Sequence, residues 1–580
     1  MKKRFNDTKG LSHTMALILG IDAGGTHVDS VIYDSSRQEV LCKAKAFTTR
    51  SDYSIGIRQS VERLQFQDLN RVSSVHFTST ISVNSILENK LARTCLILLG
   101  EKIQESLPYH NRLVIYSKDY PVINTNAWGD KIDIQSLYGE YIAGSDSVII
   151  SDSEGNLPRE MSLANFITSV YPAKCICAAN RKGNYYQRTL QSLLDAGLRP
   201  ILSELYGCTE RVMRELHVTA PIYVLNNSGK LIPAEKASNA PLECVLAGPA
   251  ASVAGGKFLT DEDTFLLVDM GGTSADVTKI QNRVARGRTQ VILNQEYRLE
   301  MESIDIQSFA IGGDSHIHYD QRGNITIDQK KVIPLCVAGF WHPHLLEEMQ
   351  SYRKPENYEL FTAYETDCYI AGMKKLYTSL TNFEKIVVDC VRKKPHSLFW
   401  LARHFNTDPD ALHMKTLVDE GYLQRISFTP TDLLHVTGEY ISWNREMSVC
   451  AASIMAETGR MEVDEFIRKS KERIKNNLVL SCMQSVANFE KTSFDFRKNA
   501  AASFLIDQYL ECGNKFMDVE FSITKPIVAL GAPSGAWMRD VASKLGTRLV
   551  LPRYYEVGPA IGAAVSTVDG YQNLRCAPEE

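Results

Sequence analysis

One pattern, D-x-G-G-T-x-x-D, occurs twice in the chain: first as Asp22-Ala23-Gly24-Gly25-Thr26-His27-Val28-Asp29, and again as Asp269-Met270-Gly271-Gly272-Thr273-Ser274-Ala275-Asp276. Each copy follows an apolar run, 16–21 and 265–268, which predicts a buried strand. A strand that ends in an acid and a Gly-Gly-Thr turn presents backbone N–H groups and a hydroxyl to an anion, and the glycines permit the backbone angles that such a turn needs. One copy alone could be an ordinary hairpin.

Two copies, each at the head of one half of the chain, predict a duplicated fold that holds the phosphates of a nucleoside triphosphate from both sides. The glycines and threonines of the turns would contact the phosphates: Gly24, Gly25 and Thr26 in the first copy, Gly271, Gly272 and Thr273 in the second. The leading acids, Asp22 and Asp269, would bind a magnesium ion, directly or through its waters.

A third glycine-rich segment, Gly531-Ala532-Pro533-Ser534-Gly535, lies between a predicted strand over 527–530 and a predicted helix over 536–545. Its small residues would let a flat base lie close to the backbone, and the helix start offers N–H groups. Turns of this kind are also common packing features. As the third member of a set, however, this one predicts nucleoside contacts at Gly531, Ala532 and Gly535.

Strand-like runs alternate with helical runs through most of the chain, which is typical of an α/β protein. Because a hairpin follows each acidic glycine turn, we expect mixed rather than purely parallel sheets. Residues 382–428 depart from this pattern and have the outline of a winged helix-turn-helix. They carry seven Lys/Arg against six Asp/Glu, without the basic stripe of a DNA-binding module. We interpret them as a structural or protein-docking insertion.

Composition excludes several classes of partner. The net charge of −4 creates no field that would attract nucleic acid or an anionic membrane, and no apolar run approaches the roughly 20 residues of a membrane-spanning helix. Thirteen cysteines without a CxxC framework favour a reducing compartment. We therefore expect a cytoplasmic protein that binds neither nucleic acid nor membrane.

The two acidic turns and the late glycine loop resemble the actin, sugar kinase and Hsp70 nucleotide-binding superfamily. Within it, the chain is similar to the hydantoinase A/5-oxoprolinase family. The segments that carry this finer resemblance follow the family order over nearly the whole chain: 22–29, 80–84, 227–229, 247–251, 269–276, 305–315, 430–432 and 558–564. The resemblance implies an α/β, duplicated actin-like (RNase H-like) ATPase fold with two lobes, Mg²⁺ and ATP between them, and a winged-helix-like insertion.

The chain departs from the family pattern in three places. Gln307 stands where a histidine is usual, which argues against a metal role there. The 382–428 segment is inserted just before Pro430-Thr431-Asp432. The chain stops soon after Gly562-Ala563-Ala564, so we expect the small C-terminal domain of typical members to be absent. These departures leave the ATP site intact and bear on the substrate.

The resemblance also implies an ATP-dependent enzyme that opens or carboxylates a small carbonyl compound. ATP would phosphorylate an amide or enol oxygen, so the task of the protein is largely positioning and charge neutralisation. We expect a hydrolase of cyclic amides such as hydantoin, 5-oxoproline or a lactam. A subunit of a ketone carboxylase is the alternative, and a hydantoinase B-like subunit is an expected partner.

Four acids are candidates for acid/base catalysis. Asp29 and Asp276 end the two patterns; either could act as base, and a role in pinning the hairpins fits them at least as well. Asp305 and Asp314 are the remaining candidates.

Other classes use the same fold. A sugar kinase would show a catalytic Asp in an acceptor loop, which we cannot identify. A sugar-responsive repressor usually carries its helix-turn-helix ahead of the first turn, with a cysteine-rich zinc loop. An activator of a corrinoid or radical enzyme often brings clustered iron–sulfur cysteines. The sequence shows neither the zinc loop nor the cysteine cluster.

Two histidine pairs invite a metal hypothesis. His316 and His318 would lie on one face of a strand beside Asp314, whereas His342 and His344 would lie in a loop. Zinc needs three or four ligands with supporting partners, so we interpret His316 and His318 as a half-exposed strand face.

The predicted organisation has five parts. A disordered tail over 1–14 is favoured over a secretion signal, whose removal would discard the first glycine turn. The first actin-like lobe spans 15–225 and the second begins at 226–345. The insertion with its flanks spans 346–429, and 430–580 completes the second lobe.

Overall fold

The computed structural model describes residues 17–567 apart from 50–51, 88–89, 102, 104–106, 109–111, 117–141, 143, 171–173, 294–296, 352–363, 373, 375–379, 491–493 and 511–517. The predicted tail over 1–14 lies outside the described residues. The chain divides into two compact units. Unit 1 comprises the described parts of Met1–Thr264, Ile280–Ile306 and Arg553–Glu580, and unit 2 those of Phe265–Lys279 and Gln307–Pro552. The predicted lobe boundaries remain predictions.

The central sheet of unit 1 has the order β10-β9-β4-β1-β2-β3. Its strands are β1 (Leu17–Ala23), β2 (His27–Asp34), β3 (Glu39–Phe47), β4 (Val72–Ser79), β9 (Ile222–Leu225) and β10 (Leu231–Pro233). The first three form an antiparallel meander, while β4 lies parallel to β1 and β9 parallel to β4. The sheet is therefore mixed, as the hairpin after the first glycine turn predicts.

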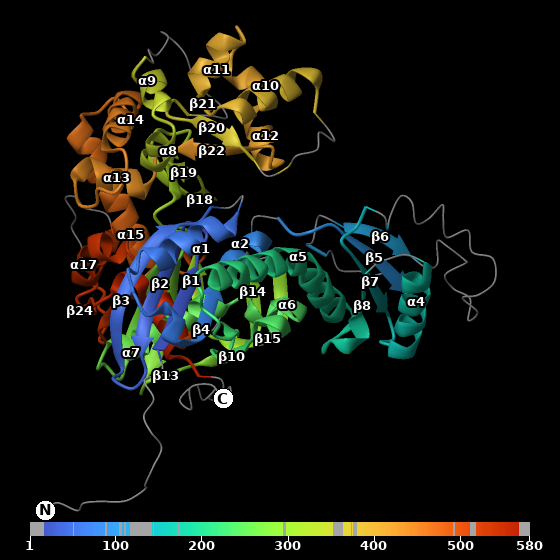
Figure 1. Ribbon diagram of the computed structural model, residues 1–580. Helices are drawn as coiled ribbons and strands as arrows, with labels where there is room; N and C mark the ends of the chain where they lie inside the picture. The colour runs from blue at the N-terminus through green and yellow to red at the C-terminus, as the bar shows by residue number, and fades with distance from the viewer. Residues whose placement is uncertain are drawn as a thin grey trace, which may run out of the picture. The chain divides into compact units, whose positions relative to one another are not determined.

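Helices cover both faces of this sheet. Figure 1 shows α1 (Tyr53–Glu62) and α5 (Tyr185–Glu215) side by side over one face. On the other, α7 (Ala247–Leu259) packs against α18 (Gly558–Val565). The two backbones approach so closely that a Cβ on Gly255 would overlap the carbonyl oxygen of Gly558, and one on Gly562 would overlap that of Ala251. Small residues are required at these positions because any larger side chain would separate the helices.

Unit 1 also contains a smaller, wholly parallel sheet. Its order is β6-β5-β7-β8, built from β5 (Thr94–Leu99), β6 (Arg112–Tyr116), β7 (Ser147–Asp152) and β8 (Cys175–Cys177). Helix α4 (Leu157–Val170) packs on it, and a ribbon of β14 (Gly287–Leu293) and β15 (Tyr297–Ile304) packs near α5. The short helix α2 (Ile81–Leu87) follows β4.

A second sheet repeats the order of the first. It runs β13-β12-β11-β23-β24, with β11 (Phe265–Met270), β12 (Ala275–Gln281), β13 (Val284–Ala285), β23 (Ile527–Leu530) and β24 (Leu549–Val550). Strand β23 lies parallel to β11, and β24 parallel to β23. In each sheet, the strand that ends in the leading acid of a glycine turn lies between its hairpin partner and a parallel strand. In the first sheet β1 lies between β2 and β4, and in the second β11 lies between β12 and β23. This shared order shows the predicted duplication.

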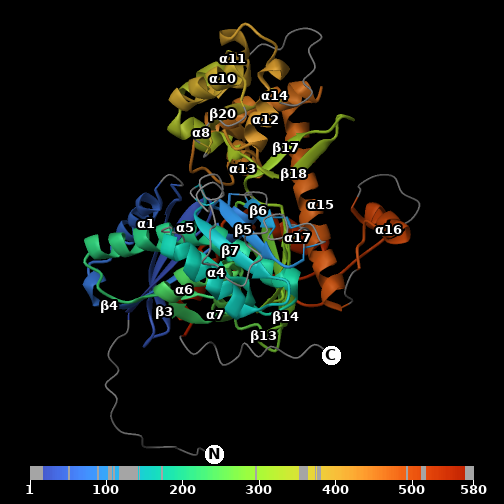
Figure 2. The ribbon, with the colours of Figure 1, turned by 90° about the vertical axis from the view of Figure 1, so that its right-hand side faces the viewer.

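The helical part of unit 2 surrounds one long helix, α15 (Val463–Glu490), which Figure 2 shows beside α17 (Ser534–Lys544). Its neighbours α13 (Pro430–Thr437) and α14 (Arg445–Thr458) pack against it. Helix α8 (Leu335–Trp341) packs against α13 and α14, and α9 (His344–Gln350) against α14. A hairpin of β17 (Ser315–Tyr319) and β18 (Ile325–Lys331) connects the glycine-rich segment to this region. Helix α16 (Ala500–Leu510) follows α15 in the chain.

The insertion has the winged-helix-like form predicted from its sequence. It contains α10 (Asn382–Lys393), α11 (Leu398–His404), the short helix η5 (Pro409–Leu412), α12 (Met414–Asp419) and β22 (Leu423–Ser427). Strand β22 joins β19 (Ile333–Pro334), β20 (Cys368–Ala371) and β21 (His396–Ser397) in a four-stranded sheet. A capping box between Thr381 and Glu384 begins α10, which buries Val387, Val388 and Val391. Local sequence signals therefore fix this segment.

None of the described helices combines the length and the apolar character that crossing a bilayer requires. Every cysteine among the described residues is a free thiol.

Candidate functional site

The first glycine turn is a tight hairpin between β1 and β2. Gly24 N–H donates to the carbonyl of His27 at 2.8 Å. The end of β3 holds the turn from the side, because the Thr48 hydroxyl donates to the carbonyl of Gly24 at 2.7 Å and Thr48 N–H to that of Thr26 at 3.0 Å. Gly25 lies between these tethered residues, and the largely buried Asp22 precedes them at the end of β1.

The second glycine turn has the same hydrogen bond at the equivalent position. Gly271 N–H donates to the carbonyl of Ser274 at 2.9 Å. A Cβ atom built on Gly271 would meet nothing closer than 3.9 Å, so a ligand can approach this backbone. Gly272 and Thr273 complete the turn. Asp269 lies at the end of β11 and Asp276 near the start of β12.

A second backbone segment, residues 311–315, donates hydrogen bonds to the carbonyl groups of this turn. Gly313 N–H donates to the carbonyl of Gly271 at 3.2 Å, and Asp314 N–H to that of Gly272 at 2.7 Å. A Cβ on Gly312 would lie 2.5 Å from the Gly272 oxygen, so only glycine permits this approach. The 311–315 segment therefore serves as a support for the second glycine turn. Its sequence suggested glycine-rich character but not this contact.

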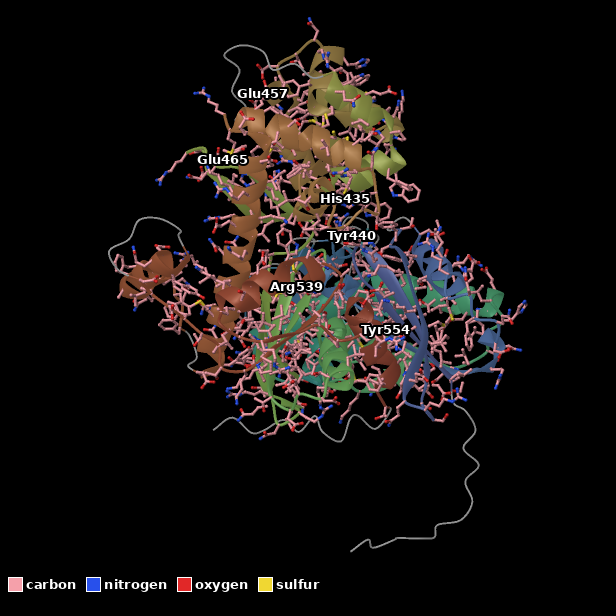
Figure 3. All side chains as sticks on the ribbon, turned by 90° about the vertical axis from the view of Figure 1, so that its left-hand side faces the viewer. His435, Tyr440, Glu457, Glu465, Arg539 and Tyr554 are labelled. Carbon is pink, nitrogen blue, oxygen red and sulfur yellow. The ribbon has the colours of Figure 1, made fainter. Side chains whose placement is uncertain are left out.

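Thr431 and His435 of α13 hold that support in place. Thr431 donates from its hydroxyl to the carbonyl of Gly313 at 2.8 Å. His435 accepts at Nε2 from the N–H groups of Ser442 and Trp443, so its Nδ1 carries the proton and donates to the carbonyl of Thr431 at 2.8 Å. Figure 3 shows His435 next to Tyr440, and their ring centroids lie 5.3 Å apart. Sequence analysis missed His435 because no motif surrounds it.

The backbone of the late glycine-rich segment, residues 531–535, packs directly against the backbone that leads into the second glycine turn. Gly531 has φ of +87°, and a Cβ there would overlap the carbonyl oxygen of Met270 and lie 2.9 Å from Asp269 Oδ1. Ala532 and Pro533 follow, and Gly535 lies in the first turn of α17. The structure thus brings Asp269, the second glycine turn and the loop at 531–535 together within unit 2.

Asp276 is an unusual carboxyl group. Its pKa is raised to about 7: burial is the largest cause and the charge of Asp269 adds to it, while hydrogen bonds from Ser308 and Ser274 and the charge of Lys331 partly offset the rise. Ser308 lies directly opposite Asp276 in the pairing of β12 with β16 (Gln307–Phe309). A carboxyl that titrates near neutral pH can accept or release a proton under physiological conditions.

Asp29, the counterpart of Asp276, has a different environment. Lys45 Nζ lies 2.7 Å from Asp29 Oδ1 and 2.8 Å from Oδ2. Burial raises the pKa of Asp29, and Lys45 opposes that rise. This ion pair between the buried Asp29 and the half-buried Lys45 fits the role of pinning the β2–β3 pairing. The acid/base role of Asp29 remains a prediction.

The other two acids lie in different units. Asp305 belongs to unit 1, where its carboxylate lies 3.5 Å from Arg288. Asp314 belongs to unit 2 and lies directly after the supporting glycines. Gln307 accepts a hydrogen bond from Asn488 of α15 at 2.9 Å, which is a packing contact. The acid/base roles of Asp305 and Asp314 remain predictions.

Two polar residues in the family-like segments have structural roles. Asn227 donates to the carbonyl of Leu242 at 2.8 Å and accepts from Leu246 N–H at 2.7 Å, which anchors the start of α7. Asp432 accepts from the N–H groups of Leu335 and Cys336 and from the Ser448 hydroxyl. Both side chains are buried.

Two family models match the chain: the hydantoinase/oxoprolinase N-terminal region over residues 18–124, and hydantoinase/oxoprolinase over residues 188–332. Over these two ranges the chain matches the hydantoinase/oxoprolinase family. The matched ranges contain both acidic glycine turns and the 311–315 segment.

Among curated proteins, the chain is 22% identical over 355 residues to the caprolactamase subunit alpha of Pseudomonas jessenii, covering 53% of the chain and 50% of that relative. It is 22% identical over 360 residues to the acetophenone carboxylase gamma subunit of Aromatoleum aromaticum, covering 53% and 48%. The chain spans about half the length of the curated relatives it matches.

Two solved structures share the fold. A nucleotide-free acetone carboxylase has a TM-score of 0.62 at 14% identity and covers 95% of the chain and 70% of its own. The ATP-dependent caprolactamase from Pseudomonas jessenii has a TM-score of 0.52 at 15% identity and covers 94% and 70%. These similarities extend over nearly the whole chain and confirm the predicted actin-like α/β fold class.

Proposed function

We propose that this chain binds Mg-ATP and uses it to activate a carbonyl oxygen during hydrolysis of a cyclic amide. The observation that carries the proposal is the assembly in unit 2, where an acid, an open glycine turn and the loop at 531–535 meet. Backbone N–H groups in such turns bind phosphates. The caprolactamase relative, by its name, acts on a cyclic amide.

The residues fit a hard divalent cation such as Mg²⁺, which prefers carboxylate and phosphate oxygens. Asp269 would hold it in unit 2, and Asp22 is the equivalent acid in unit 1. Asp276 Oδ1 is buried and makes no hydrogen bond within the described residues. Such an oxygen suits a positioned water. When bound, the ion would neutralise charge on the phosphates.

The reaction consumes ATP and two water molecules and yields ADP, phosphate and the ring-opened amino acid. The terminal phosphoryl group passes to the amide oxygen, which makes the carbonyl carbon a better electrophile. The first water attacks that carbon and the C–N bond breaks, which leaves an acyl phosphate. The second water hydrolyses the acyl phosphate to the carboxylate and phosphate. Asp276 is the group we assign to proton transfer, because its pKa of about 7 matches a general base at neutral pH.

A second candidate function is a subunit of an ATP-dependent ketone carboxylase. It is favoured by the acetophenone carboxylase match and by the acetone carboxylase structure, which has the higher TM-score of the two solved relatives. In that reaction ATP would activate an enol or bicarbonate oxygen. The names of the curated relatives, subunit alpha and gamma subunit, support a partner subunit in either case.

Release of phosphate from Mg-ATP, measured with a substrate panel, tests the proposal. Lactams, hydantoins and 5-oxoproline form one arm, and ketones with and without bicarbonate form the other. Stimulation by a cyclic amide alone supports the hydrolase, and stimulation that needs both ketone and bicarbonate supports the carboxylase. Since turnover can require the partner, nucleotide binding is measured separately by calorimetry. No binding of Mg-ATP would reject both.

A further inference from the structure

A cluster of metal-ligating side chains lies on the β17–β18 hairpin of unit 2. We propose that His316, His318 and Asp328 bind a divalent transition-metal ion of the zinc type. His316 and His318 share one face of β17, and Asp328 lies directly opposite His316 in the strand pairing. One ligand atom from each residue lies within 4.8 Å of the others. The third ligand is Asp328, whereas sequence order suggested Asp314.

Each histidine has a ring nitrogen that its neighbours leave for a metal. His316 is only 2% exposed, which corrects the predicted half-exposed face at this residue. His318 Nδ1 lies 3.0 Å from the carbonyl oxygen of Tyr319. That bond places the proton on Nδ1 and leaves the Nε2 lone pair available to a ligand.

Supporting contacts fix the orientation of both rings. His316 Nε2 lies 3.1 Å from Ser427 Oγ of β22, so Nδ1 is the ring atom that remains for a metal when Nε2 donates. The ring of Tyr364 lies 4.9 Å from both histidine rings, which are 4.8 Å from each other. Oriented histidines with a carboxylate are typical of zinc sites with an open coordination position.

The local charge also permits a cation. Arg425 is the positive group near His316, and it is paired with the buried Asp367 at 3.4 Å. Asp328 therefore adds a negative charge that this ion pair does not cancel. Two imidazoles and a carboxylate favour borderline metals such as Zn²⁺ over Mg²⁺, which prefers all-oxygen ligands.

A second histidine–acid cluster provides a matched control. His344, at the start of α9, lies near Glu348 and His396. Here both Glu348 oxygens are already used, one by His396 Nδ1 and one by Ser397 N–H, each at 2.7 Å. His344 Nε2 lies 2.8 Å from the carbonyl oxygen of Pro395. This network is satisfied without an ion, so we expect the metal at the β17–β18 hairpin.

The test is titration of the metal-stripped full chain with ZnCl₂ in the absence of nucleotide, with Co²⁺ as a spectroscopic substitute. We expect a single tight equivalent of zinc and a Co²⁺ visible band of low-symmetry nitrogen and oxygen ligation. His318→Ala and Asp328→Asn should each weaken zinc binding at least tenfold. Asp320→Asn, in the turn of the same hairpin, and Glu348→Gln should leave it unchanged.

Circular dichroism of each variant establishes that the fold is retained. His318 and Asp328 are half-buried, so their substitution leaves the hairpin core intact, and the two variants are independent of each other. Absence of a zinc equivalent in the wild-type chain would overturn the proposal. Binding that survives in both His318→Ala and Asp328→Asn, or that is lost only in Glu348→Gln, would overturn it as well.

Discussion

Asp269 and Gly531 lie at the ends of two neighbouring parallel strands, and a Cβ atom on Gly531 would lie 2.9 Å from Asp269 Oδ1. Only a glycine at position 531 therefore permits the loop to pack this closely against the carboxylate and the backbone of Met270. The pairing joins residues from opposite ends of unit 2, 262 positions apart in the printed sequence. The acid and the loop proposed to contact the nucleoside thus form one site through the pairing of β11 with β23.

Replacement of this acid should impair ATP turnover. Asp269→Asn removes the charge assigned to the magnesium ion and should lower turnover at least tenfold, equivalent to about 1.4 kcal/mol of barrier. Phosphate release by the purified variant, with its melting temperature as a check on folding, measures this. Asp320→Asn in the β17–β18 turn is the control. Wild-type turnover by a folded Asp269→Asn protein would refute the assignment.

Two glycines near the second turn should respond differently to the same substitution. Gly312→Ala would place a Cβ 2.5 Å from the Gly272 oxygen, and such overpacking costs about 1–3 kcal/mol. Gly271→Ala meets nothing within 3.9 Å and should keep the stability of the fold while weakening Mg-ATP binding, because its methyl group enters the ligand side. Thermal melting and calorimetry separate the two effects. Equal loss of stability in both variants would contradict the support role of the 311–315 segment.

The raised pKa of Asp276 predicts a pH-dependent stability. The folded protein holds this proton more tightly than the unfolded chain, whose carboxyl has the ordinary value of 3.8. The stabilising contribution is therefore fully present below pH 3.8 and is lost as the pH rises through about 7. Asp276→Asn, uncharged throughout, should lose less melting temperature than wild type between about pH 5 and pH 8.

The exposed Asp464→Asn substitution in α15 is the control for this pH series. Parallel melting curves for wild type and Asp276→Asn at every pH would show that Asp276 is ionised throughout, and would remove the basis for its assignment as base. Asp276→Asn should also lose the change of rate near neutral pH that titration of the general base produces in the pH–rate profile.

The contact between α7 and α18 should tolerate no side-chain growth. Gly562→Ala would drive a methyl group into the carbonyl of Ala251 and should cost about 1–3 kcal/mol. Gly207→Ala is a matched substitution in α5, where a Cβ meets nothing within 4 Å. It should stabilise the protein by about 0.5–1 kcal/mol, because alanine favours the helix. If the melting temperatures of Gly562→Ala and Gly207→Ala shift in the same direction, the close packing of α7 against α18 is contradicted.

The winged-helix-like insertion should not bind DNA. Its seven Lys/Arg and six Asp/Glu cannot neutralise a row of phosphates, which supplies most non-specific affinity. Gel shifts with duplex DNA at low and moderate salt should show no salt-sensitive complex. Tight binding that weakens steeply with salt would make this segment a nucleic-acid module.

Much of the fold was predictable because its signals are local. The runs at 94–99, 222–225 and 527–530 match β5, β9 and β23, and the capping box at Thr381 and Glu384 begins α10. The duplicated glycine turns also predicted the duplicated fold, which the two sheets show in their strand order. Contacts between distant segments were not predictable, since no local pattern records them. Examples are Thr431 against Gly313, Lys45 against Asp29, and Asp328 beside His316.

Unit 1 is assembled from both sides of unit 2 in the chain, and its core includes α18 at residues 558–565 packed on α7 and β1. During synthesis, α7 and β1 leave the ribosome long before α18 exists. The surface of small residues on α7 and β1 that packs against the backbone of α18 therefore stays exposed while the residues of unit 2 are translated. The sheet of unit 2 likewise needs β23 and β24, which lie just before α18 in the chain. The core of each unit therefore depends on pairing between its earliest strands and segments that are made hundreds of residues later, a high contact order that slows folding.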